Sequence, residues 1–73
     1  MIIFDKLWTT MKNKGVTTYT LREKHFVDSR TIRRLKANEN MTTNTLSNLC
    51  TILNCRLEDI AEYISDEHFI EYQ

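Results

Sequence analysis

The stretch Asp28-Ser29-Arg30-Thr31-Ile32-Arg33-Arg34-Leu35-Lys36 has the pattern of a short helix with one apolar stripe and one basic face. Successive residues of an α-helix are rotated by about 100° around its axis, so Ile32 and Leu35 fall on the same side. Arg30 and Arg34 lie one turn apart on the opposite side, a position suited to contact with a polyanion. A solvated surface helix is the alternative interpretation of such a charged face.

The residues at the two ends of this stretch predict where the helix begins and ends. Asp28 is a favourable N-cap residue, because its carboxylate accepts a hydrogen bond from an otherwise unpaired backbone N–H. Asn38 follows the helix, and asparagine tolerates the left-handed conformation that often ends one. We therefore expect a helix over residues 29–37, with Ser29 exposed in its first turn and Arg33 flanking the basic face.

Charge is divided unevenly along this chain of 73 residues, although the formal net charge is zero. Residues 1–36 contain nine lysines and arginines against three acidic residues, a balance of +6, and residues 37–73 carry the opposite balance of −6. A chain of this length forms one small domain. The asymmetry predicts a basic face and an acidic back, and a basic face is the usual electrostatic footprint of phosphate binding.

Composition argues against several other classes of protein. No apolar run approaches the ~20 residues of a membrane span, and the apolar opening is too short for a signal peptide, so we expect a cytoplasmic protein with no membrane partner. Cys50 and Cys55 do not form a CxxC pair, and we interpret both as small buried apolar residues of a reducing compartment, with no metal bound. No catalytic constellation or phosphate-cradling glycine loop is present. We expect neither an enzyme nor a cofactor, and we infer no small-molecule ligand.

Apolar spacing predicts an all-α, compact five-helix domain, because hydrophobic residues recur at intervals of three and four along the chain. Thr17 and Thr42 are expected to cap the second and fourth helices, and Gly15 and Asn54 to end the first and fourth. The residues that define these faces are Phe4, Leu7, Trp8 and Met11 in the first helix, Leu21 in the second, Leu46, Leu49, Cys50 and Leu53 in the fourth, and Leu57, Ile60, Ala61 and Ile64 in the fifth.

We expect one domain over residues 1–66, followed by a C-terminal tail, 67–73. The tail has three interpretations: it frays, it extends the last helix, or its aromatic and aliphatic side chains pack on a partner. In the last case Phe69, Ile70 and Tyr72 would lie at a dimer contact.

Two short helices joined by a tight turn, the second with an arginine face, match the helix-turn-helix plan. Gly15-Val16-Thr17, Leu21 and the run from Val27 to Leu35 resemble the Cro and phage-repressor (XRE-like) type of helix-turn-helix transcriptional regulators. The segment from Thr45 to Ile60 strengthens the resemblance, in particular to a small bacterial or mobile-element subfamily. The resemblance covers about residues 4–65 and implies a lambda-repressor-like DNA-binding fold.

The resemblance implies that helix 29–37 is a recognition helix that lies in the major groove of double-stranded DNA. It assigns base reading to Ser29, Arg30 and Arg34, and arginine can donate two hydrogen bonds to the O6 and N7 of guanine. Phosphate contacts are expected from side chains that flank this face or open the neighbouring helices. These residues are Thr17, Thr18, Arg33, Asn40, Thr42 and Thr43.

The sequence departs from the family pattern at three places. His25-Phe26 stands where many members have glycine in the turn, and a phenylalanine forced to positive φ would be strained. Either the turn is reshaped or Phe26 fills the core. Thr43 occupies a position that is often apolar in relatives, and Arg56 one where a capping serine is common.

The leading functional interpretation is a sequence-specific, double-stranded DNA-binding transcriptional regulator. A single recognition helix reads few base pairs, so we expect a homodimer, at least on DNA, and a palindromic operator with half-sites about one helical turn apart. The alternative is a protein-interaction module, antitoxin-like or inhibitory, that reuses the fold; net neutrality and the acidic back favour it. Single-stranded RNA binding ranks third, because exposed aromatic platforms are sparse.

Overall fold

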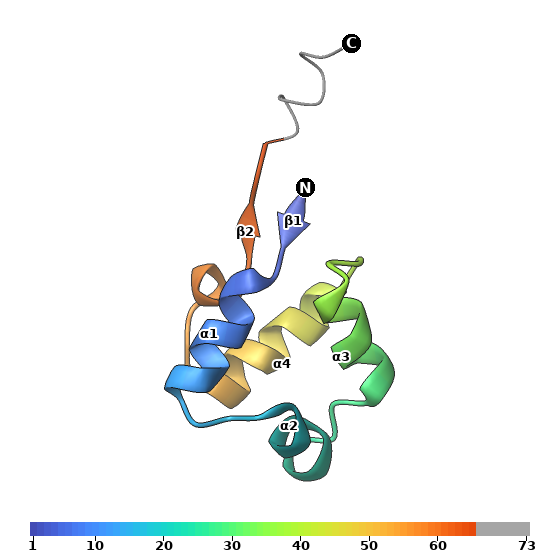
Figure 1. The fold of residues 1–73 in the computed structure, drawn as a ribbon, viewed down its shortest axis with the longest axis vertical. Coiled ribbons are helices and arrows are strands. Elements are labelled where there is room, and N and C mark those ends of the chain that lie inside the picture. Colours follow the sequence, from blue (N-terminus) through green and yellow to red (C-terminus); the bar gives the residue numbers. More distant parts are fainter. Residues whose placement is uncertain (66–73) are drawn as a thin grey trace.

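The computed structural model describes residues 1–65, which form four α-helices, one 3₁₀ turn and a two-stranded ribbon. In Figure 1, α4 passes between α1 and α3, and the ribbon projects from the helices on the side away from α2. In chain order the elements are β1 (Ile2–Ile3), α1 (Asp5–Asn13), α2 (Thr18–Lys24), α3 (Ser29–Lys36), α4 (Thr43–Leu53), the 3₁₀ turn η1 (Leu57–Asp59) and β2 (Glu62–Tyr63).

The hydrophobic core takes side chains from all four helices and from the segments that flank them. Its buried members were all expected from the apolar spacing, and they are Phe4, Leu7, Met11, Leu21, Ile32, Leu35, Leu49, Leu53 and Ile60. Trp8, which we expected in the core, is only half-buried and packs against its edge. The core therefore lies directly beneath α3 and holds that helix by Ile32 and Leu35.

A residue in the left-handed conformation follows each of the four helices, and after α1, α3 and α4 it is the residue that the sequence predicts. Gly15 has φ +71° just beyond α1, Asn38 has φ +56° beyond α3, and Asn54 has φ +50° at the end of α4. The side chains of Thr17 and Thr42 accept hydrogen bonds from backbone amides in the first turns of α2 and α4. The predicted caps and stops are confirmed at these positions.

The C-terminus of α4 ends in a Schellman motif that brings the two cysteines together. The amide of Cys55 donates to the carbonyl of Cys50 at 3.0 Å, and the amide of Asn54 donates to Thr51 at 3.3 Å. This pattern places Cys50 and Cys55 at the apolar contact that usually accompanies the motif. Both are free thiols, half-buried against the core. Burial raises the pKa of the Cys55 thiol, and the neighbouring Cys50 raises it further.

The expectation of a fifth helix is wrong, and the fold is mostly helical rather than all-α. Leu57–Asp59 makes a single 3₁₀ turn, after which Glu62–Tyr63 pairs antiparallel with β1. The apolar spacing predicted that Leu57 and Ile60 would share a buried helix face. In the structure Ile60, directly after the 3₁₀ turn, is fully buried, whereas Leu57 within the turn is 53% exposed. The backbone after it gains hydrogen bonds from β1, in the register Ile2↔Tyr63 and Ile3↔Glu62. The predicted tail, 67–73, lies outside the described residues.

One hydrogen bond links the start of the chain to the end of α3. The backbone amide of Phe4 donates to the side-chain oxygen of Asn38 at 2.8 Å, and the amide of Glu39 donates to the carbonyl of Arg34 at 2.9 Å. Because Asn38 is in the left-handed conformation, its side chain can leave the helix axis and reach the residue that precedes α1. The C-terminal end of α3 is thereby anchored on the ribbon side of the molecule.

Candidate nucleic-acid interface

Two capped helices, α2 and α3, are joined by residues 25–28 and form a helix-turn-helix. The Thr17 hydroxyl accepts from the amide of Thr20 at 3.1 Å, and the Asp28 carboxylate accepts from the amide of Thr31 at 2.7 Å. Each bond satisfies a backbone donor that the first turn of a helix leaves unpaired. Leu21 of α2 is fully buried, which fixes the inner face of that helix against the core. The local sequence thus determines where both helices begin.

The outward face of α3 carries the side chains expected to read bases. Ser29, Arg30 and Arg34 are all exposed, and Ile32 and Leu35 are buried on the side of the helix opposite the two arginines. The interpretation of this stretch as an amphipathic helix is therefore confirmed. Arginines one turn apart on an exposed helix face can reach a groove together, because side chains at i and i+4 lie one above the other.

Asp28 is a carboxylate set among arginines at the N-terminus of α3. Hydrogen bonds from the Thr31 side chain and backbone lower its pKa below the ordinary value, and the charges of Arg30 and Arg34 lower it further. The group therefore stays ionised over the whole physiological range and keeps its capping role.

The turn between α2 and α3 has the conformation that the sequence made doubtful. Phe26 adopts φ +59° and its side chain is 87% exposed, so the alternative in which it fills the core is wrong. Val27 takes the inward position instead, packing against the core while its amide donates to the carbonyl of Leu21 at 2.9 Å. The turn thus keeps the shape that glycine would allow, with a phenylalanine in glycine's place.

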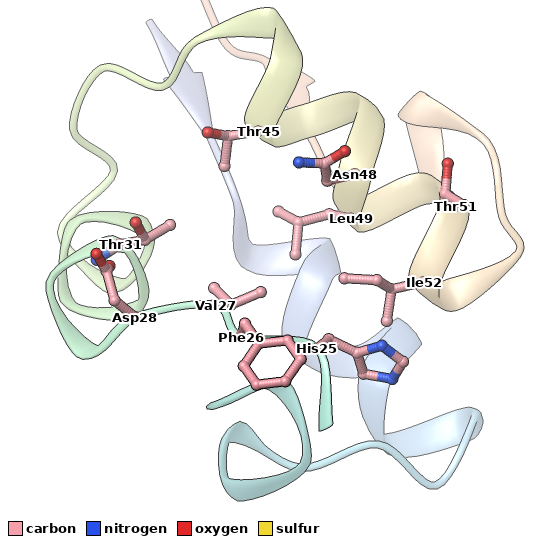
Figure 2. Close-up of a pocket in the computed structure, with 10 residues that line it drawn as sticks. All are labelled: His25, Phe26, Val27, Asp28, Thr31, Thr45, Asn48, Leu49, Thr51 and Ile52. Carbon is pink, nitrogen blue, oxygen red and sulfur yellow. The ribbon is translucent and has the colours of Figure 1, made fainter. Parts of the chain in front are cut away.

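A hollow lies between this turn and α4 (Figure 2). Val27, Leu49 and Ile52 supply apolar side chains to it, and Phe26 and His25 lie at its near edge in this view. Its remaining lining residues are polar: Asp28, Thr31, Thr45, Asn48 and Thr51. No lysine or arginine lines the hollow, so it does not share the charge of the arginine face.

The expected phosphate-contacting residues fall into separate groups. Thr18 and Arg33 line one hollow between α2 and α3, together with the base-reading candidate Ser29. Asn40 lines another with Arg34. Thr17, Thr42 and Thr43 are exposed at the starts of α2 and α4, where Thr42 accepts from the amide of Thr45 at 3.2 Å.

Arg22 and Lys36 are two cations that the sequence-based site did not include. Both line the hollow that Thr18 and Arg33 share. The spacing of four between Thr18 and Arg22 and of three between Arg33 and Lys36 places each pair on one helix face, which is a signal the sequence does contain. The sequence does not show that these two faces meet, because their meeting depends on the angle between α2 and α3.

The fold and its exposed basic helix define a helix-turn-helix DNA-binding domain. The chain belongs to the Cro/C1-type HTH DNA-binding domain family, which it matches over residues 6–66. Among solved structures, the transcriptional regulator VanUg superposes with a TM-score of 0.79. The two chains are 31% identical, and the match covers 89% of this chain and 87% of the VanUg chain. A search of curated protein sequences found no match.

Within residues 1–65 no helix has the length and apolar character needed to cross a membrane. The same residues contain no group of three or more histidine, cysteine or acidic side chains placed to hold a metal ion.

Proposed function

We propose that this chain is a transcriptional regulator that binds double-stranded DNA in a sequence-specific manner by inserting α3 into the major groove. The observation that carries the proposal is the exposed face of Ser29, Arg30 and Arg34 on a capped helix whose other side is buried in the core. Its support is membership of a DNA-binding family and the similarity to VanUg, which is itself a transcriptional regulator. Cytoplasmic location and the absence of enzymatic activity stay predictions of the sequence.

Base reading is assigned to Ser29 and Arg30 in the first turn of α3 and to Arg34 one turn beyond. Arg30 and Arg34 would each donate two hydrogen bonds to a guanine, a pairing that discriminates against other bases by roughly 1–3 kcal/mol. Ser29, with one short hydroxyl, would accept or donate a single bond at the helix start. Phosphate contacts are assigned to Thr17, Thr18, Arg33, Asn40, Thr42 and Thr43. The capping hydroxyls of Thr17 and Thr42 also share hydrogen bonds of 3.1 Å with the hydroxyls of Thr20 and Thr45. Where the partner threonine donates this bond, the capping hydroxyl keeps its own proton, so capping is compatible with a phosphate contact.

A homodimer on a palindromic operator follows from the small footprint of one recognition helix. The interface we propose includes the tail residues Phe69, Ile70 and Tyr72. The exposed apolar side chains at the ribbon end of the molecule, Leu57 and Tyr63 among them, are compatible with an interface on that side.

Selection of bound sites from a random duplex pool tests the proposal. The expected result is an enriched motif with two-fold symmetry and guanines in each half-site. Arg30→Ala and Arg34→Ala should then relax preference at single positions of the motif. Arg33→Ala should weaken binding almost equally on all sequences and make the salt dependence less steep by about one unit.

The competing proposal is a protein-interaction module that reuses this fold. The acidic residues of the C-terminal half and the exposed side chain of Tyr63 favour it. The two functions differ in their response to salt, because binding through several phosphates weakens steeply as salt rises. A chain that enriches no duplex from the pool, yet retains a protein partner with little dependence on salt, would reject the DNA-binding proposal.

A further inference from the structure

A hollow between α2 and α3 gathers three cationic side chains around two hydroxyl groups. Arg22 of α2 and Arg33 and Lys36 of α3 line it, and its apolar wall is the buried Ile32. The hydroxyls come from Thr18 and Ser29. We refer to this group of six residues as the basic cleft.

The cations of the basic cleft have no carboxylate partner among residues 1–65. Arg22, Arg33 and Lys36 are exposed, and the structure pairs none of them with an acidic side chain in this range. Three like charges around one hollow repel each other, and the repulsion raises the free energy of the protein when it stands alone. An anion placed between them reverses the sign of this interaction.

The basic cleft lies on the flank of the face that we propose reads bases. Relative to Ser29, a helical rotation of about 100° per residue places Arg30 and Arg34 at roughly 100° and 140°, and Lys36 at roughly −20°. The cleft is thus turned toward α2 by about a quarter of the helix circumference. When the outward face of α3 points at base edges, such a flank faces the wall of the groove, which consists of sugar and phosphate.

We propose that the basic cleft seats one phosphate of the DNA backbone, with Arg22 and Lys36 as additional phosphate-contacting residues. Arg22 and Arg33 can each present two parallel N–H donors to phosphate oxygens, and Lys36 adds a compact charge. The Thr18 hydroxyl supplies a neutral donor, and Ser29 at the edge of the cleft keeps its assignment to a base. Since the seat draws on both helices, it also fixes the depth and rotation of α3 in the groove. This inference rests on the proposed DNA-binding function.

The test compares Arg22→Gln, Lys36→Gln and the double variant with Lys12→Gln, which removes the same charge from α1 outside the cleft. Circular dichroism first checks that all four proteins keep their helices. Affinity is then measured at several salt concentrations on the selected duplex and on an unrelated duplex.

Each single variant should weaken binding by up to roughly fivefold at physiological salt, equally on both duplexes, and lower the salt slope by up to about 0.9, because the remaining cations still contact the phosphate. The double variant should lose no more slope than this, because both side chains share one phosphate. Lys12→Gln should leave the slope unchanged.

Several results would overturn the inference. A double-variant slope loss near 1.8 would mean two separate phosphates. Unchanged slopes in the cleft variants, on a selected duplex that the wild-type protein binds, would leave the proposed function intact and reject the seat. Titration with inorganic phosphate at constant ionic strength separates the two sources of this anion. If inorganic phosphate binds the wild-type protein and not the cleft variants, while those variants keep the salt slope of the wild-type protein on DNA, the cleft binds a free anion instead. Failure of the wild-type protein to bind any duplex would reject the proposed function itself.

Discussion

The backbone conformation of Phe26 is unfavourable for a residue with a Cβ, and its free-energy cost can be measured against the contribution of the ring. At φ +59° a residue with a Cβ is in a conformation that costs roughly 1–2 kcal/mol relative to a right-handed one. The burial of the ring offsets little of this cost, because the residue is 87% exposed. About an eighth of a ~200 Å² side chain is covered, which contributes about 0.6 kcal/mol at ~25 cal/mol per Å². We expect the turn to be strained by more than its side chain contributes.

Three substitutions separate these contributions. Phe26→Ala keeps the strain and loses the contact, so it should destabilise the protein by about 0.6 kcal/mol. Phe26→Gly removes the strain but adds roughly 0.5–1 kcal/mol of backbone entropy in the unfolded chain, so its stability should lie within about 1 kcal/mol of the wild-type value. Phe26→Asn tolerates the left-handed conformation without that entropy and should be the most stable of the three.

Urea denaturation measures the series, and Tyr19 provides its control. Tyr19 is also an exposed aromatic residue, 63% accessible, but it lies within α2, where φ is that of an ordinary helix. There the order must reverse, with Tyr19→Gly about 1 kcal/mol less stable than Tyr19→Ala. If glycine ranked below alanine at position 26 as well, the reasoning from backbone strain would be refuted. A loss above 2 kcal/mol in Phe26→Ala would show that the ring makes contacts absent from the structure.

Three other expectations concern the cap, the core and the tail. The Asp28 pKa is lowered on folding, so the stability from this cap is present above the unfolded pKa and is lost as pH falls through the lowered pKa of the folded protein; the Tm difference between Asp28→Ala and the wild type should therefore shrink as pH falls from 7 to 2. Leu35→Ala, at a fully buried site, should destabilise by about 2–5 kcal/mol in urea unfolding, and a loss under 1 kcal/mol would contradict the packing. A chain ending at Ser65 should be monomeric by light scattering; an unchanged dimer would place the interface outside the tail.

Local patterns in the sequence predicted most of the helical core and failed at its C-terminal end. The burial of Leu21 and Leu35 follows from apolar spacing, and the stops at Asn38 and Asn54 follow from side-chain chemistry, so both could be read along the chain. The pairing of β1 with β2 could not, because neither two-residue strand carries a pattern of its own and each depends on a partner at the other end of the chain.

The candidate site divides in the same way. Exposure of Arg30 and Arg34 on α3 follows from the helical period alone, and the structure bears it out. The meeting of Arg22 with Lys36 depends on how α2 crosses α3, which is set by packing between helices. Spacing within either helix carries no information about that crossing. The resemblance to a family with glycine in this turn pointed to a positive φ at Phe26, but whether the ring would point inward or outward depended on Val27 taking the core position.

The ribbon formed by β1 and β2 has a consequence for how this chain folds. The helices between residues 5 and 53 form through contacts close in sequence, whereas the ribbon must join segments near the two ends of the described chain. Closing so long a loop costs entropy that only an already packed core can offset, so the ribbon is expected to form after the folding transition state. Substitutions in Ile2–Ile3 or Glu62–Tyr63 should therefore accelerate unfolding and leave the folding rate almost unchanged.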